Sequence, residues 1–174
     1  MGGTYRGSLL PWASMHDVVI RGGLVVDGTG AEGAEADVAI AGDRIVAVGK
    51  DVGAGRREVD ARGKLVTPGF VDMHTHYDAQ ASWDPYLTPS GWHGCTTVIM
   101  GNCGVGFAPA HPDKHDWLIG MMEGVEDIPG AAMHEGIRWG WESFPEFLDV
   151  LAREPRALDI GAQVPHCPVR AYVM

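Results

Sequence analysis

The chain has 174 residues, of which 45% are hydrophobic and 21% charged, and its net charge is −10. This composition is typical of a globular protein and excludes a fibrous or disordered one. Its longest basic cluster is Arg56-Arg57, which argues against nucleic-acid or anionic-membrane partners. No run approaches the roughly 20 apolar residues of a membrane span. Three cysteines are too few for a disulfide framework. We therefore expect a cytoplasmic protein with reduced thiols.

Short apolar runs separated by tight turns dominate residues 16–66. Residues 17–26 consist of two apolar runs separated by a turn at Gly22-Gly23. Residues 36–49 show the same pattern, with the turn at Ala41–Asp43. Residues 57–66 are expected to form another short strand. The sequence predicts a small antiparallel sheet or β-sandwich here. Residues 1–15 are expected to be a disordered or non-native extension, with Met15 as an alternative start.

A glycine-rich segment in this region, residues 28–33, formally matches the dinucleotide-binding pattern GxGxxG. That pattern requires a helix directly after the glycines. The following residues, ADVAIAGDRIVAV, have strand periodicity instead. We therefore reject a nucleotide site.

From residue 67 the pattern changes to strands that alternate with helices. Such alternation predicts parallel βα units, of which there are about three. An eight-stranded barrel takes about 250 residues, so this chain is too short to close one. The expected strands are 69–76, 95–103 and 159–166, the expected helices are 113–123 and 143–154, and residues 124–142 are expected to be irregular. Ser143 and Glu146 form a capping-box pattern for the second helix.

Metal-ligand side chains gather where the first two of these strands end. Alternation along a strand places His74 and His76 on one face, and Asp72 with them. Cys103 ends the next strand, just before Gly104. Thiolate and imidazole together suit zinc. Asp78, two residues after His76, is the candidate for a carboxylate that orients an imidazole.

Other polar groups have simpler interpretations. His166 ends the third predicted strand and could face the site, but a structural histidine is the favoured reading. Pro168 soon after it removes a backbone donor and leaves the local geometry open. Glu123, Glu126 and Asp127 are interpreted as a solvated loop. The tryptophans are read as core and loop anchors; they include Trp83, Trp92, Trp139 and Trp141.

Four segments carry a family resemblance: TPGFVDMHTHYDAQ, WDPYLTPSGWHGCTTVIMGNCGVGFAP, MMEGVEDIPG and WGWESFPEFLDVL. They resemble the N-terminal third of the N-acyl-D-amino-acid deacylases (D-aminoacylases) of the metal-dependent amidohydrolase superfamily. The resemblance implies an α/β fold: the N-terminal part of a (β/α)8 TIM barrel over residues 67–174, preceded by part of a composite β-sandwich over residues 16–66. It also implies that His74, His76 and Cys103 bind one or two zinc ions, with Cys103 bridging. Two departures from the family pattern are Cys95, where an apolar residue is usual, and Cys167-Pro168.

The implied activity is zinc-dependent hydrolysis of the linear amide of a small-molecule N-acyl-D-amino acid, giving a carboxylate and a free D-amino acid. The family's later metal-binding histidines and its aspartate acid–base group would lie beyond Met174, so the residues here offer no candidate for that role. Two alternatives stay open. The chain could be an inactive amidohydrolase fragment, or it could share the cyclic-amide chemistry of hydantoinases and dihydroorotases. The GVEDIPG segment and the bridging thiolate favour the acyl-D-amino-acid branch.

Overall fold

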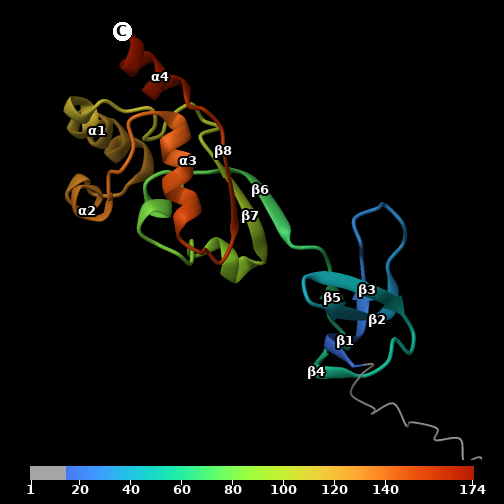
Figure 1. Ribbon diagram of the computed structural model, residues 1–174. Coiled ribbons are helices and arrows are strands. Elements are labelled where there is room, and N and C mark those ends of the chain that lie inside the picture. Colours follow the sequence, from blue (N-terminus) through green and yellow to red (C-terminus); the bar gives the residue numbers. More distant parts are fainter. Residues whose placement is uncertain (1–14) are drawn as a thin grey trace, which may run out of the picture. The chain divides into compact units, whose positions relative to one another are not determined.

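The computed structural model describes residues 15–174, so the extension predicted for residues 1–15 lies outside the described residues except for Met15. The chain forms two compact units that divide after Pro68. Figure 1 shows strands alone before this point and a mixture of strands and helices after it.

The first unit is a five-stranded sheet in the order β3-β2-β1-β4, with β5 paired to β1. Its strands are β1 (His16–Val25), β2 (Ala34–Ala41), β3 (Arg44–Gly49), β4 (Gly55–Asp60) and β5 (Leu65–Val66). The β2–β3 hairpin turns where the sequence predicted it. The glycine-rich segment 28–33 leads into strand β2, as the periodicity of the residues after it predicted.

Two expectations for this unit are wrong. β1 is one strand with a register shift between Ile20 and Gly23, because Gly22 has a φ of +63° and bulges without interrupting the pairing. The sheet is also mixed, because β4 and β5 both run parallel to β1. Residues 57–66 contain most of β4, all of β5 and the turn between them.

The second unit is built on a parallel three-stranded sheet in the order β6-β7-β8. These strands are β6 (Phe70–Thr75), β7 (Cys95–Met100) and β8 (Asp159–Ala162). The helices are α1 (His115–Glu126), α2 (Gly130–Gly136), α3 (Phe144–Arg153) and α4 (His166–Val173), with 3-10 turns η2 (Gln80–Ser82), η3 (Ser90–His93) and η4 (Pro112–Lys114). This is a mixed α/β arrangement, and residues 15–174 form no closed barrel.

Helices cover one face of the parallel sheet. Val98 and Met100 of β7 are fully buried in one cluster with side chains from α1, α2 and α3. Alternation along β7 sends Thr97 and Ile99 to the other face, where both are only half-buried. The helix contributions to this core are Leu118, Ile119, Met122, Met133, Phe147 and Leu151.

Both predicted helices are present, and one of them extends further than predicted. The Ser143–Glu146 capping box is present, and α3 begins as predicted. The predicted helix 113–123 is present as η4 and α1, which continues to Glu126; Glu123 and Glu126 therefore belong to α1 and not to a loop. None of the helices described between residues 15 and 174 has the length and apolar character needed to cross a membrane.

Two helices were not expected. α2 lies within residues 124–142, and α4 begins at His166, where a strand end was predicted. Pro168 is compatible with α4 because it occupies the first turn, where backbone N–H groups have no partner within the helix.

Candidate metal centre

The strand that carries the histidine pair is bulged. Asp72 pairs with Val98 and Thr75 pairs with Met100, so three residue steps on β6 face two on β7. Val98 and Met100 share the helix-covered face, and Asp72 and Thr75 lie on the same side as their partners. Alternation about Thr75 then sends His74 and His76 to the opposite, open face. The prediction that Asp72 shares the face of His74 is therefore wrong, because the bulge reverses the alternation.

The second arm of the site is the turn that follows β7. Gly101 and Gly104 have φ values of +83° and +85°, and the Gly104 N–H donates to the Gly101 carbonyl at 3.0 Å. A side chain at Gly101 would also collide with the Gln163 backbone, because its Cβ would lie 2.3 Å from that carbonyl oxygen. Both glycines are therefore required by geometry. They place Cys103 at the carboxyl end of β7, next to the end of β6.

These two arms bring three donor atoms together. His74, His76 and Cys103 each offer one ligand atom, and all three atoms lie within 4.8 Å of one another. The two imidazole centroids are 5.5 Å apart, with ring planes inclined at 32°. All three residues are solvent-accessible. Two nitrogen donors and one thiolate fit zinc, which prefers such ligands. No Asp or Glu among the described residues belongs to the cluster.

Asp78, two residues after His76, is buried. Its exposed fraction is 3%, and its Oδ2 has no hydrogen-bond partner. Burial raises the pKa of Asp78 to about 7. Its Oδ1 lies 2.8 Å from the position a Cβ would take on Gly106, so the carboxyl packs directly under the loop that follows Cys103. No hydrogen bond joins Asp78 to His74 or His76 among the described residues.

The remaining candidates lie outside the cluster. His166 is exposed at the start of α4, and its Cβ lies 3.6 Å from the position a Cβ would take on Gly104, while the next residue, Cys167, donates its N–H to the Gly104 carbonyl at 2.8 Å. Glu123 accepts from the Gly130 N–H at 2.8 Å and so caps α2. Sequence reasoning missed Asn102, whose side-chain amide bonds the Met73 carbonyl at 3.3 Å. The sequence feature that could have drawn attention to Asn102 is its position between Gly101 and Gly104, next to Cys103.

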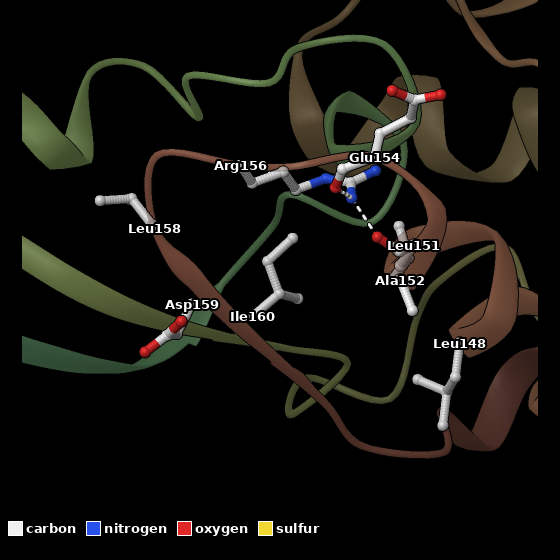
Figure 2. A pocket seen from close by; sticks show the side chains of 8 residues that line it. All are labelled: Leu148, Leu151, Ala152, Glu154, Arg156, Leu158, Asp159 and Ile160. Atoms are coloured by element: carbon white, nitrogen blue, oxygen red, sulfur yellow. Dashed lines mark hydrogen bonds between the residues drawn. The ribbon is translucent and has the colours of Figure 1, made fainter. Parts of the chain in front are cut away.

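A cavity of about 370 Å³ lies elsewhere, between α3 and the segment that leads into β8. Figure 2 shows Arg156 in its wall, hydrogen-bonded to the Leu151 carbonyl. The guanidinium also donates to the carbonyls of Glu154 and Ala81. Arg156 thus serves the last carbonyls of α3, as cations near helix C-termini commonly do. This cavity adjoins the amino end of β8, whereas the three donor atoms gather at the carboxyl ends of β6 and β7.

Comparison with known proteins gives a consistent result. The family described as "Amidohydrolase family" matches residues 57–174. A D-aminoacylase from Alcaligenes xylosoxydans xylosoxydans is 37% identical over 91% of this chain and 31% of its own length. An N-acyl-D-aspartate deacylase from the same organism is 33% identical over 98% of this chain and 32% of its own length.

Solved structures agree with these relatives. A crystal structure of D-aminoacylase matches with a TM-score of 0.73 at 36% identity, covering 91% of this chain and 31% of that one. An N-acyl-D-glutamate deacylase from Bordetella bronchiseptica, complexed with zinc and a phosphonate inhibitor, matches with a TM-score of 0.66 at 29% identity, covering 92% and 31%. The chain spans about a third of the length of these relatives. Two thirds of the chain match the family, and it therefore belongs to the amidohydrolases as a D-aminoacylase-like member.

Proposed function

We propose that the protein acts in the zinc-dependent hydrolysis of N-acyl-D-amino acids, releasing a carboxylate and a free D-amino acid. The observation that carries the proposal is the convergence of His74, His76 and Cys103 to within 4.8 Å at the ends of two parallel strands. Ligand sites of parallel α/β folds gather at this edge. The relatives named above supply the substrate class, since they are D-aminoacylases and N-acyl-D-amino-acid deacylases.

Each residue has a defined part in this proposal. His74 and His76 would hold zinc through imidazole nitrogens, and Cys103 would hold it through its thiolate. When bound, zinc supplies Lewis-acid polarisation of the acyl carbonyl and activates water for attack on the amide. Asp78 bonds neither imidazole; its proposed part is to place a buried carboxylate two residues after His76, where its charge favours a bound cation. The leaving amine needs a proton from an acid, and no Asp or Glu of the described residues joins the cluster to take that part.

The proposal is tested by metal analysis and by turnover of paired enantiomers. Purified protein is expected to hold zinc and to hydrolyse N-acetyl-D-amino acids in preference to the L-forms, with loss of turnover on chelation. Cys103→Ala is expected to remove zinc, because the site then keeps two nitrogen donors. Cys95→Ala is the matched control, since Cys95 lies at the opposite end of β7. Full zinc content in Cys103→Ala, or turnover that survives chelation, would contradict the proposal.

The open edges of the parallel sheet favour a second candidate, an inactive amidohydrolase fragment. β6 and β8 each have one neighbour among the described residues. An inactive fragment would bind zinc weakly and show no turnover of either enantiomer. Turnover by the 174-residue chain itself would exclude this candidate.

A further inference from the structure

The bulge in β6 leaves backbone groups without strand partners. Met73 and His74 lie between the paired residues Asp72 and Thr75, with Ile99 opposite them on β7. A regular parallel ladder cannot satisfy every N–H and C=O at such a point. Backbone groups left without partners cost free energy, so other groups must replace the missing bonds.

Two side chains bond the backbone of this bulge. The Asp72 carboxylate accepts from the His74 N–H at 3.1 Å. The Asn102 side-chain amide donates to the Met73 carbonyl at 3.3 Å. The bulge that turns His74 to the open face is thus held from within β6 by Asp72 and from the neighbouring turn by Asn102.

Asn102 also links the two arms of the metal centre directly. It is followed by Cys103 and lies in the turn defined by Gly101 and Gly104. Its partner, the Met73 carbonyl, belongs to the peptide group that joins Met73 to His74. One hydrogen bond therefore spans the gap between the residue before the thiolate and the residue before the first imidazole.

We infer that Asn102 and Asp72 are positioning residues that set the separation and orientation of Cys103 and His74 by bonding the backbone bulge between them. Neither side chain needs to touch the metal. The inference rests on the proposed metal centre, because its consequence is a defined distance between thiolate and imidazole.

The test uses cobalt(II) in place of zinc, because a thiolate bound to cobalt(II) gives a charge-transfer absorption that depends on the sulfur–metal geometry. Zinc affinity is measured in parallel by competition with a chelator. For Asn102→Ala we expect a shifted or weakened charge-transfer band and a loss of zinc affinity of about threefold to tenfold, the size expected for one hydrogen bond. Asp72→Ala should change the charge-transfer band and the zinc affinity in the same direction. Asp72→Asn should restore both readouts, since its amide oxygen can still accept from the His74 N–H.

A matched control separates positioning from general stability. Gln80 also donates its side-chain amide to a backbone carbonyl, that of Thr88 at 2.9 Å, in the connection between β6 and β7. Gln80→Ala should lower the thermal midpoint without changing the cobalt spectrum.

The outcomes distinguish this inference from the proposed function. A wild-type spectrum and wild-type zinc affinity in Asn102→Ala would overturn the inference and leave the metal centre intact. The absence of any thiolate band in the wild-type protein, or its persistence in Cys103→Ser, would overturn the metal centre and the inference with it.

Discussion

At the scale of single residues, the buried polar groups are informative because burial of a polar group is costly. Among the described residues, the buried polar side chains are Thr75 and Asp78, which flank His76. Thr75 is satisfied, since its hydroxyl donates to the Ile99 carbonyl at 3.0 Å. Asp78 keeps one oxygen without a partner. We propose that this carboxyl, two residues after His76, has a supporting function in the metal centre.

Asp78→Asn tests that function because it removes the charge with little change in volume. We expect zinc affinity to fall about tenfold to a hundredfold, as for other groups that support metal ligands. The measurement is chelator competition at pH 8, and urea unfolding of the metal-free protein distinguishes a lost support from a lost fold. Unchanged zinc affinity would show that Asp78 is a packing residue only.

His115 is a second residue with an unsatisfied buried atom, and it lies on α1 away from the cluster. Its ring stacks on Trp139 with centroids 3.5 Å apart, and its Nε2 has no partner. Burial lowers the pKa of His115, although Asp113 and Asp116 act in the opposite direction. The folded state therefore favours the neutral ring. The stability that this confers is present above the unfolded value of about 6.5 and is lost as pH falls through the lower, folded value.

His115→Phe keeps a ring against Trp139 and cannot be protonated. Between pH 7.5 and pH 5, we expect the free energy of unfolding of the wild-type protein to fall more steeply than that of the variant. Urea titrations across this range measure the difference. Parallel curves would mean that His115 takes up its proton equally well in the folded and unfolded states.

At the scale of elements, the sequence predicted those features that depend on neighbouring residues in the chain, such as the start of a helix. The Ser143–Glu146 pair fixed the start of α3 because a capping box satisfies N–H groups at the helix start. The reversed alternation at His74 could not be read from β6 alone, because it depends on pairing with β7. The parallel direction of β4 likewise depends on its pairing with β1, which is distant in sequence. The three metal-ligand candidates could be identified from their residue types and their positions at strand ends. The function of Asn102 could not, because it depends on a hydrogen bond to the Met73 carbonyl that only the structure shows.

The capping box gives a prediction for α3. In Ser143→Ala the Glu146 N–H loses its side-chain acceptor, and the free energy of unfolding should fall by about 1 kcal/mol. Ser82→Ala is the comparison, since the Ser82 hydroxyl bonds a backbone carbonyl outside any α-helix cap. Urea unfolding measures both. Equal losses in the two variants would mean that the cap adds nothing specific to α3.

At the scale of the whole molecule, the parallel sheet has two outer strands with free edges among the described residues. Parallel sheets are normally buried on both faces and closed or covered at their edges. In β6, Phe70, Val71 and Met73 have exposed fractions of 59%, 55% and 57%. The first unit has an exposed apolar residue of its own in Ile45, at 67%. The free β6 edge therefore carries exposed apolar side chains.

The last prediction concerns this surface. The 174-residue chain, purified at micromolar concentration, should self-associate through the β6 edge, because unpaired strand edges with apolar side chains pair with other chains. Val71→Lys should reduce this association, since a charge on an edge strand opposes pairing. Ile45→Lys removes a comparably exposed apolar side chain from the first unit and leaves the β6 edge unchanged. Light scattering after size exclusion measures the mass of each variant. A monomeric wild-type chain would refute the prediction, and relief by Ile45→Lys alone would assign the association to the first unit.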